Sequence, residues 1–402
     1  MKVDIRNGRI AGSIRVPGSK SIAQRALILA TRKGGRVTNV PESGDLEILC
    51  NGLRALGYRV DEDGDSRIVG GTQGVSAVII DAGDNGTAAR CLTALAATGT
   101  AEVTIDGSER LRQRPMAPLV SALRELGAVV SADSLPLTVR GPIKGGTIKV
   151  DTADSSQFAT ALVLMVERLP GLKIKVTGKA SFSYVGLTAT VMRNFENPFV
   201  VEPDFSSAAS HAVGAAVTGG DLVLEGLSMS SPQPDARILP FLSRAGCMVT
   251  QEDHSVRVRG GMLHGITANV ANCPDLAPLI GVLGFFAEGE TVVSGAPHLK
   301  HKESDRIACT VSMIRAVGGT AEPRDDGFVI YGDGIPDGEP VELPADMANG
   351  ITLSSHGDHR MAMAAAVLAL RIPGVTVTGS DAVGKSYPRF FDDLSLLTEL
   401  SS

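Results

Sequence analysis

The sequence predicts a protein of the mixed α/β (α+β) class that folds as two globular domains. Its 402 residues exceed what one hydrophobic core usually organises, because domains of roughly 100 to 200 residues are typical. A pattern of helix, turn and strand recurs along the chain, and short β-rich runs lie between its copies. The copies form two groups of three, which predicts two domains of three similar units each.

In each copy of the pattern an amphipathic helix passes through a turn into a strand. The turn glycines Gly57 and Gly127 are 70 positions apart, and Gly246 and Gly318 are 72 apart. The rhythm shortens in VEPDFSS (201–207), where we place the domain boundary; a chance spacing of ordinary αβ units is the alternative. The copies are LRALGYRV (53–60), LRELGAVV (123–130), MRNFENPFV (192–200), LSRAGCMV (242–249), IRAVGGTA (314–321) and FFDDLSLLTEL (390–400).

Short runs rich in Val, Ile and Thr, each bounded by turn residues, are typical of strands. Each unit is therefore expected to combine helices with strands. The runs are AEVTIDG (101–107), LTVRG (137–141), IKVD (148–151), LVLEG (222–226), VRVRG (256–260), TVVSG (291–295) and VTVTG (375–379).

The composition excludes several classes of function. A net charge of −6, the absence of Trp and the lack of a basic run argue against a nucleic-acid partner. The five cysteines form no C-x-x-C pair, so we expect neither a disulfide framework nor a zinc site. The apolar stretches 277–287 and 361–370 are too short for a bilayer, and residues 1–16 lack an export signal. We expect a soluble, cytoplasmic protein with no membrane partner.

The first candidate site is VPGSKSIAQRALILA (16–30), a turn that leads into an apolar-periodic helix. Ser19 or Ser21 is expected to cap this helix, whose free N–H groups attract anions. Ser21 and Arg25 are four positions apart and share a helix face beside Lys20. A capped helix with solvated charges is the alternative.

Two further motifs repeat this logic in the first half of the chain. GDNGTAARCL (83–92) is a Gly-rich turn that opens a helix, although such turns are often plain connections. DSSQFATALVLM (154–165) places two hydroxyls and an amide at the start of an apolar helix, where a simple N-cap is the alternative. The candidate anion ligands are Thr87, Arg90, Ser155, Ser156 and Gln157.

In ERLRQRPMAPL (109–119) three arginines alternate, which predicts an extended segment with all three side chains on one side. Three guanidinium groups on one face repel one another unless anions lie between them. A strand edge protected by charge is the alternative. The arginines are Arg110, Arg112 and Arg114.

In the second half, LKHKESDRIA (299–308) predicts a helix on which Lys302 and Arg306 are four positions apart, interleaved with Glu303 and Asp305. An exposed ladder of ion pairs is the alternative.

HGDHRMAMAAAVLAL (356–370) places His359 and Arg360 at the start of a helix apolar enough to be buried, which favours a ligand over a cap. GSDAVGKS (379–386) has the spacing of a nucleotide-binding P-loop, but Tyr-Pro follows at once where a helix must begin. We therefore reject a P-loop and expect Lys385 to be a functional basic residue that the last strand brings to a cleft.

Together, these segments resemble the enolpyruvyl transferases, in the branch of the 5-enolpyruvylshikimate-3-phosphate synthases. The resemblance runs nearly end to end. It implies two domains, residues 18–202 and residues 1–17 with 203–402, each of three βαβαββ repeats in an inside-out, barrel-like fold, with the active site in the cleft between them. It also implies a monomer without cofactor or metal. The implied reaction moves the enolpyruvyl group of phosphoenolpyruvate to the 5-hydroxyl of shikimate 3-phosphate and releases phosphate.

The resemblance assigns the site residue by residue. The implied ligands of shikimate 3-phosphate are Lys20, Ser21, Arg25, Ser155, Ser156, Gln157, Ser181, Tyr184, Asp275 and Lys302. The implied ligands of phosphoenolpyruvate are Lys20, Gly86, Arg114, Gln157, Arg306, Arg360 and Lys385. Asp275 is expected to take the hydroxyl proton, and Glu303 or Lys20 to deliver one to C3. The two substrates carry two phosphates and two carboxylates, which explains an arginine-rich site in an acidic protein.

Two other readings remain open. The cell-wall branch of the family uses a UDP-amino sugar on the same fold. Members of that branch have a Lys-Asn pair at the position where this chain has Lys20 and Ser21. That branch also usually carries a reactive cysteine on a loop near 102–115, and no cysteine lies between Cys91 and Cys247. A non-catalytic protein that binds phosphoanions is the alternative from another class.

Overall fold

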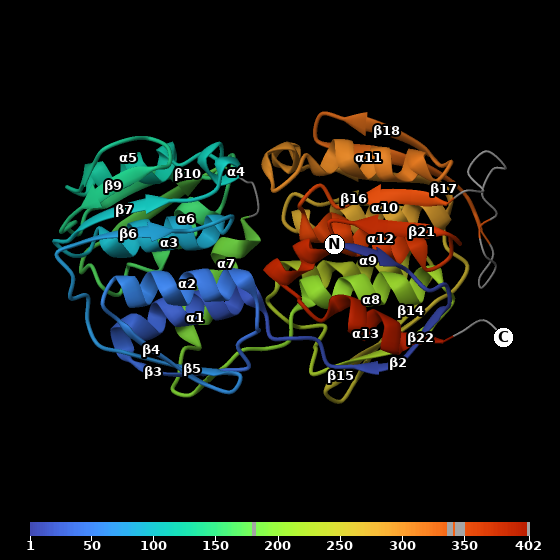
Figure 1. Ribbon diagram of the computed structural model, residues 1–402, viewed down its shortest axis with the longest axis horizontal. Coiled ribbons are helices and arrows are strands. Elements are labelled where there is room, and N and C mark those ends of the chain that lie inside the picture. The colour runs from blue at the N-terminus through green and yellow to red at the C-terminus, as the bar shows by residue number, and fades with distance from the viewer. Residues whose placement is uncertain (179–181, 336–340, 342–349, 400–402) are drawn as a thin grey trace. The chain divides into compact units, whose positions relative to one another are not determined.

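The computed structural model of the protein describes residues 1–178, 182–335, 341 and 350–399 (Figure 1). The chain divides into two compact units, one made of Gly18–Glu202 and the other of Met1–Pro17 together with Pro203–Ser402. We call them the middle unit and the terminal unit. No helix within the described residues is long and apolar enough to cross a membrane.

The middle unit contains three sheets, whose strand orders are β12-β3-β5-β4, β6-β7-β9-β8 and β10-β11. Its helices are α1 (Lys20–Lys33), α2 (Gly44–Ala55), α3 (Gly86–Ala96), α4 (Glu109–Arg112), α5 (Ala117–Glu125), α6 (Gln157–Val163) and α7 (Ser183–Arg193). Its strands are β3 (Gly35–Thr38), β4 (Arg59–Asp63), β5 (Ser66–Gly70), β6 (Ala77–Asp81), β7 (Glu102–Asp106), β8 (Val129–Val130), β9 (Leu137–Arg140), β10 (Thr147–Asp151), β11 (Lys173–Thr177) and β12 (Phe199–Val200).

The terminal unit also contains three sheets, ordered β14-β15-β13-β2-β22, β16-β17-β19-β18 and β1-β21-β20. Its helices are α8 (Phe205–Val217), α9 (Ile238–Arg244), α10 (Ala277–Phe286), α11 (Arg306–Ala316), α12 (His359–Ala369) and α13 (Phe390–Leu397), with 3-10 helices η1 (Pro234–Arg237), η2 (Pro274–Leu276), η3 (Pro297–His301) and η5 (Ser380–Lys385). Its strands are β1 (Lys2–Asp4), β2 (Arg9–Ile14), β13 (Asp221–Glu225), β14 (Met248–Glu252), β15 (Ser255–Arg259), β16 (Thr267–Asn269), β17 (Glu288–Ser294), β18 (Thr320–Arg324), β19 (Gly327–Asp333), β20 (Ile351–Ser354), β21 (Val375–Thr378) and β22 (Thr398–Glu399).

One topology recurs in both units. A parallel pair of strands is extended by an antiparallel hairpin, as in β6-β7-β9-β8 and β16-β17-β19-β18. A buried helix connects the parallel strands, α3 in the first sheet and α10 in the second, because parallel neighbours need a crossover connection. The predicted α/β class with two domains is confirmed.

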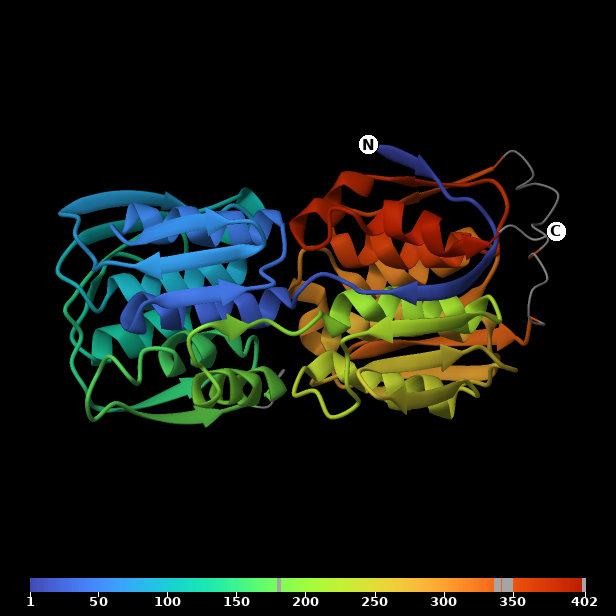
Figure 2. The same ribbon diagram turned by 90° about the horizontal axis from the view of Figure 1, so that it is seen from below.

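The first strands of the chain complete the terminal unit. β2 pairs in parallel with β13, and β1 pairs antiparallel with β21 (Figure 2). The segment that begins the chain therefore belongs to two sheets whose other strands come from its second half. The chain passes from the terminal unit to the middle unit after Pro17 and returns to the terminal unit after Glu202.

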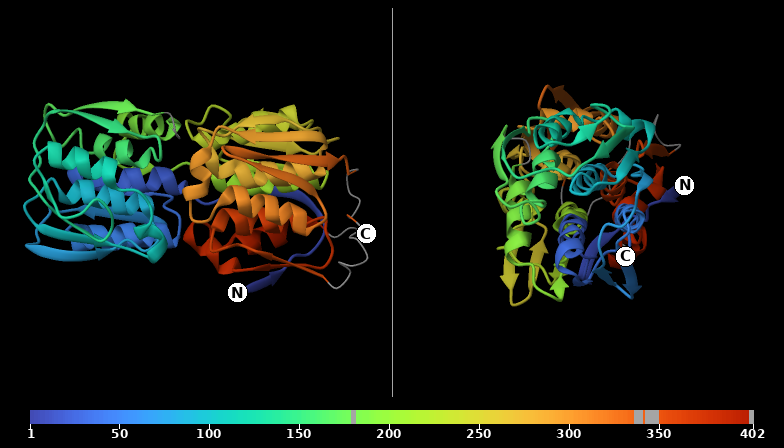
Figure 3. Two further views of the ribbon diagram at one scale, coloured as in Figure 1. Left: turned by 90° about the horizontal axis from the view of Figure 1, so that it is seen from above. Right: turned by 90° about the vertical axis from the view of Figure 1, so that its left-hand side faces the viewer.

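Helices form the interior of each unit. In the terminal unit α8, α10 and α12 contact one another, and every residue of α10 and α12 is buried. The strands lie around such helices (Figures 1 and 3). Because these helices are hydrophobic on all sides, only an interior position satisfies them. Polar residues at the N-termini of these helices therefore lie at places where a largely buried active site can form.

The predicted helix, turn and strand segments fold as expected. Gly57, Gly127, Gly246 and Gly318 follow the ends of α2, α5, α9 and α11 with φ between 85° and 107°. This left-handed conformation ends a helix, and glycine adopts it without a steric cost. A strand begins within three residues of each glycine.

The predicted extended segment at 109–119 is wrong. Residues Glu109–Arg112 form the short helix α4, because the Ser108 hydroxyl accepts a hydrogen bond from Leu111 N (3.1 Å) and Leu111 is buried. The three arginines therefore do not share one side. Arg112 pairs with Asp106 (2.7 Å), the Arg110 Nη1 atom lies 3.5 Å from Gln113, and Arg114 lies next to Gly86.

Candidate active site

The terminal unit gathers charged side chains at the N-termini of its buried helices. We call Asp275, Glu303, Arg306, Asp358, Arg360 and Lys385 the arginine–carboxylate cluster. Arg306 and Arg360 belong to the first turns of α11 and α12, and Asp275 lies in η2, directly before α10. Asp305 and Asp358 cap α11 and α12 by accepting backbone N–H groups.

Arg306 is the centre of this cluster, and its side chain is only 1% exposed. Its guanidinium donates to Asp358 (2.8 and 3.2 Å), to Asp275 (2.7 Å) and to Glu303 (3.3 Å). Burial by itself lowers the pKa of Arg306, but these three carboxylates raise it well above its usual value. Arg306 is therefore permanently charged and fixed in position.

Arg360 contacts the same carboxylate from another side. Its Nη2 atom lies 3.3 Å from Asp275 Oδ2, whereas Nε and Nη1 are buried without a hydrogen-bond partner among the described residues. Burial raises the pKa of Asp275, but the charges of Arg306, Arg360 and Lys302 hold it well below its usual range. Asp275 is therefore ionised, and Arg360 presents two donors that an anion can accept.

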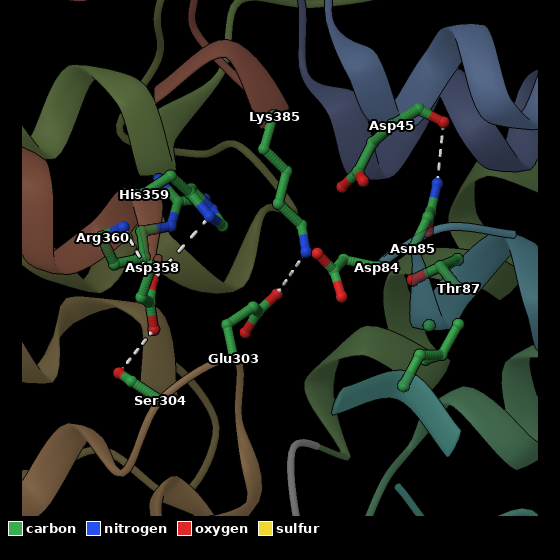
Figure 4. Close-up of polar contacts among 12 residues, drawn as sticks. Asp45, Asp84, Asn85, Thr87, Glu303, Ser304, Asp358, His359, Arg360 and Lys385 are labelled. Carbon is green, nitrogen blue, oxygen red and sulfur yellow. Dashed lines mark hydrogen bonds and ion pairs between the residues drawn. The ribbon is translucent and has the colours of Figure 1, made fainter. Parts of the chain in front are cut away.

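Lys385 completes the cluster. Its Nζ atom lies 3.1 Å from Glu303 Oε1 (Figure 4). Ser304 donates to Asp358 (3.1 Å), so the segment before α11 is bound to the cap of α12 (Figure 4). Carboxylates thus hold three cationic side chains side by side in one largely buried place.

Lys302 and Arg306 do not lie on one helix, which corrects the prediction for 299–308. Asp305 accepts hydrogen bonds from Ile307 N and Ala308 N (both 3.1 Å), so the helix begins only at Arg306. Lys302 lies between η3 and this cap, and its charge acts on Asp275. Because Asp305 caps the helix, Lys302 lies outside it, and the spacing of four residues no longer places Lys302 and Arg306 on one helix face.

A further carboxyl group, Asp235 in η1, lies near this cluster. It is buried, accepts a hydrogen bond from Ser206, and its Oδ1 has no partner among the residues that the structure describes. Burial, and then the charge of Asp275, raise the pKa of Asp235. Sequence reasoning missed this residue.

In the middle unit Lys20 begins α1 and forms an ion pair with Asp45 at 2.7 Å. The Asn85 side chain donates to the backbone oxygen of Asp45 (2.7 Å; Figure 4). It also caps α3 by accepting a hydrogen bond from Ala88 N (2.9 Å). These contacts connect the N-termini of α1, α2 and α3. Ser19 is the N-cap of α1, but its side chain makes no capping bond, contrary to one of the two expectations.

Gly86, the first residue of α3, lies against two arginines. A methyl group added at Gly86 would be 2.6 Å from Arg90 Nη1 and 2.7 Å from Arg114 Nη1. Arg90 donates to Gly86 O (2.9 Å), to Pro115 O (2.6 Å) and to Gln157 Oε1 (3.0 Å). Burial, and then the charge of Arg114, lower the pKa of Arg90 well below its usual value. Two guanidinium groups therefore lie close together at the N-terminus of α3, where the helix dipole and both charges favour an anion.

Gln157 links this place to the next helix. Its Nε2 atom donates to Thr87 Oγ1 (3.0 Å) at the start of α3, and α3 packs on α6. Ser155 Oγ accepts Gln157 N (3.2 Å), and Ser156 is the buried N-cap residue of α6. The structure therefore places Thr87, Ser155, Ser156 and Gln157 at two adjoining helix starts.

Arg25 is buried one turn into α1. It donates to Ser21 O (2.7 Å), Thr188 Oγ1 (2.9 Å) and Tyr184 O (3.3 Å). The centroid of the Tyr184 ring lies 5.9 Å from the guanidinium carbon of Arg25, so Arg25 of α1 packs against α7. Ser181, the neighbouring sequence candidate, lies outside the described residues.

Sequence reasoning missed two carboxylates that pair with the predicted cations, Asp45 with Lys20 and Asp358 with Arg306. Both carboxylates are distant in sequence from their partners, but Asp358 is the N-cap residue of α12 and Asp45 lies in the first turn of α2, and N-cap patterns point to such helix starts. Within the described residues no group of three or more His, Cys, Asp or Glu side chains is arranged to hold a metal ion.

Comparison with known proteins identifies relatives over the whole chain. The family described as EPSP synthase (3-phosphoshikimate 1-carboxyvinyltransferase) matches residues 5–199 and 196–394. A 3-phosphoshikimate 1-carboxyvinyltransferase of Methanoregula boonei is 34% identical, with 96% of this chain and 97% of the relative covered. One of Methanothermobacter thermautotrophicus is 33% identical, with 96% and 95% covered.

Solved structures share the fold. An EPSP synthase from Acinetobacter baumannii has a TM-score of 0.79 at 24% identity and covers all of this chain and 98% of its own. The enolpyruvyl transferase NikO from Streptomyces tendae has a TM-score of 0.71 at 16% identity, with 98% and 96% covered. From the match over nearly its full length and the identity to the curated relatives, the chain belongs to the EPSP synthase (3-phosphoshikimate 1-carboxyvinyltransferase) family.

Proposed function

We propose that this protein transfers the enolpyruvyl group of phosphoenolpyruvate to the 5-hydroxyl of shikimate 3-phosphate and releases phosphate. One observation carries the proposal: Arg360 is buried with two donors unpaired among the described residues, next to a charged Arg306 and an ionised Asp275. A buried guanidinium with free donors suits a small, multiply charged anion. The family membership supplies the identity of that anion.

We assign the site residues to the two substrates as follows. Arg306, Arg360 and Lys385 of the terminal unit bind phosphoenolpyruvate, and so do Gly86 and Arg114 of the middle unit. Gly86 serves because a larger residue would displace Arg114. Lys20 and Gln157 act on both substrates. We assign to shikimate 3-phosphate the residues Ser21, Arg25, Ser155, Ser156, Ser181, Tyr184 and Lys302.

The chemistry is an addition followed by an elimination. The 5-hydroxyl oxygen bonds to C2 of phosphoenolpyruvate while C3 gains a proton, which gives a tetrahedral adduct. Loss of a proton from C3 and breakage of the bond between C2 and the phosphate oxygen then release phosphate and restore the double bond. Asp275, ionised by its arginine neighbours, accepts the hydroxyl proton. Glu303 or Lys20 exchanges the proton at C3.

The fixed positions of these groups are the protein's contribution to rate. Arg306 is held by three carboxylates, so its charge requires no rearrangement when an anion arrives. Preorganised positive charge stabilises the developing phosphate, and orientation of the two substrates removes part of the entropic barrier.

We place the protein in the cytoplasm, as a monomer.

The test measures phosphate release from phosphoenolpyruvate with shikimate 3-phosphate as acceptor. A parallel reaction contains UDP-N-acetylglucosamine instead. We expect release only with shikimate 3-phosphate. Release only with the sugar nucleotide would move the protein to the cell-wall branch, and release with neither acceptor would favour a binding protein without catalysis.

A further inference from the structure

Two buried side chains and one partly exposed carboxylate of the terminal unit form a polar chain directly beside the segment that carries Lys385. The Tyr387 hydroxyl donates to Asp393 Oδ2 at 2.6 Å, and His211 Nε2 lies 3.3 Å from the same hydroxyl. Tyr387 is 1% exposed, His211 is fully buried, and the Asp393 side chain is 15% exposed. These residues come from α8, from the turn after η5 and from α13.

The direction of each hydrogen bond follows from the number of protons. Tyr387 has a single O–H, and Asp393 receives it, so the Tyr387 oxygen accepts from His211 Nε2–H. Burial lowers the pKa of His211 to about 4, so the ring is neutral near pH 7 and carries one N–H. One hydroxyl therefore satisfies a buried donor and a carboxylate at once.

The same residue is fixed through its backbone and its ring. Tyr387 N and Ser386 N donate to Val383 O (2.7 and 3.0 Å), which closes the end of η5. The Tyr387 ring lies edge-on to His211 and to Phe390, with centroids 5.8 Å apart in both pairs. η5 itself packs on α12. The position of Tyr387 consequently determines how the two preceding residues leave η5.

Lys385 is one of those preceding residues. Its ammonium group lies 3.1 Å from Glu303 and 14% of its side chain is exposed, so a small shift of its backbone changes its distance from the cluster. We propose that Tyr387 is a positioning residue for Lys385, held by Asp393 and His211, and that its hydroxyl sets the affinity for phosphoenolpyruvate. The kinetic part of this inference rests on the proposed function.

The central variant is Tyr387→Phe, which removes the hydroxyl and keeps the ring. We expect KM for phosphoenolpyruvate to rise about fivefold to tenfold, as for the loss of one hydrogen bond, while KM for shikimate 3-phosphate changes less than about twofold. Adding Tyr387→Phe to Lys385→Ala should raise KM for phosphoenolpyruvate no further, because the residue to be positioned is absent. Additive effects would overturn the inference.

A second variant separates positioning from stability. Tyr387→Phe leaves His211 Nε2–H buried without an acceptor, which destabilises the fold. The double variant Tyr387→Phe/His211→Phe removes that donor, so we expect its melting temperature to recover while KM for phosphoenolpyruvate stays raised. Recovery of KM together with the melting temperature would show that the hydroxyl acts only on folding.

The matched control is Arg389→Gln. Arg389 is 73% exposed and approaches the other Asp393 oxygen at 3.5 Å, so its loss should leave KM unchanged. A readout independent of the reaction is amide hydrogen exchange. Residues 383–387 should exchange faster in Tyr387→Phe than in the wild type or in Arg389→Gln. Unchanged exchange would contradict the inference even if the wild type proved inactive, whereas an inactive wild type with faster exchange in the variant would reject only the proposed function.

Discussion

Arg306 and Asp358 form a two-bonded ion pair inside the terminal unit: Nε lies 2.8 Å from Oδ2 and Nη2 lies 3.2 Å from Oδ1. The two side chains are 1% and 0% exposed. Asp358 Oδ1 also accepts Arg360 N (2.9 Å), so one carboxylate joins the first residue of α11 to the first turn of α12. Two arginines proposed to bind phosphoenolpyruvate thus depend on the same acid.

Replacing Asp358 by Asn keeps the size of the side chain and removes its charge. We expect the free energy of unfolding to fall by about 3 kcal/mol, because removal of one partner from a buried ion pair leaves the other charge poorly compensated. Urea denaturation at pH 7 measures the change. The control Asp133→Asn removes a carboxylate that is 66% exposed, and it should cost less than about 1 kcal/mol. Equal losses in the two variants would contradict this account.

Asp275→Asn tests the proposed general base. Turnover should fall by about 100-fold or more, since an amide does not accept the hydroxyl proton. Binding of phosphoenolpyruvate should not weaken, because Arg306 and Arg360 lose a competing anion at 2.7 and 3.3 Å. Phosphate release and titration calorimetry measure the two quantities. The exposed Asp333→Asn should alter neither, and a fully active Asp275→Asn would reject the assigned role.

The elements that local sequence decides were predicted well. The apolar run after Asp358 predicted a buried helix, and it forms α12; the glycines that follow α2 and α9 predicted helix ends. A helix period or a capping residue acts over a few neighbours, so one segment contains the whole signal. The failures at 109–119 and 299–308 arose where a single capping side chain, Ser108 or Asp305, determined the conformation.

The partners within the site were not predictable in this way. Lys20 and Asp45 are 25 residues apart, and Arg306 and Asp358 are 52 apart. Such pairs depend on which helix starts meet in the folded unit, and that information lies in the packing of the whole core. The cations and the carboxylates Asp275 and Glu303 could therefore be assigned to the site from sequence. Asp45, Asp358 and the pairing of each carboxylate with its cation could not.

Gly86→Ala should weaken phosphoenolpyruvate binding more than it affects folding. The new methyl group would lie 2.6 and 2.7 Å from the guanidinium ends of Arg90 and Arg114, which must move away. We expect KM for phosphoenolpyruvate to rise by about tenfold, the cost of one hydrogen bond to a charged group. Because those atoms end flexible side chains and Ala favours a helix, unfolding free energy should change by less than about 1 kcal/mol.

The matched control for this prediction is Gly186→Ala. A methyl group at Gly186, on α7 of the same unit, meets nothing within 4 Å. Its steady-state constants should equal those of the wild type. An unchanged KM in Gly86→Ala would mean that Arg114 does not take part in binding phosphoenolpyruvate.

His211 should make the terminal unit sensitive to acid. Burial lowers its pKa from 6.5 to about 4, so between these values the unfolded chain binds a proton that the folded protein does not. The free energy of unfolding should therefore fall as the pH decreases from 6.5 to 4, by up to about 3 kcal/mol, and should not depend on this group above that range. Urea midpoints at pH 5 and pH 7 measure the effect.

His211→Phe should flatten this dependence, since Phe does not titrate. His298, whose pKa burial and the charge of Lys302 lower to about 3, remains in the variant and leaves a residual slope. His254→Gln replaces an exposed histidine and should keep the full slope of the wild type. If His211→Phe and the wild type lose stability equally between pH 7 and pH 5, the buried ring is not the group that takes up the proton on unfolding.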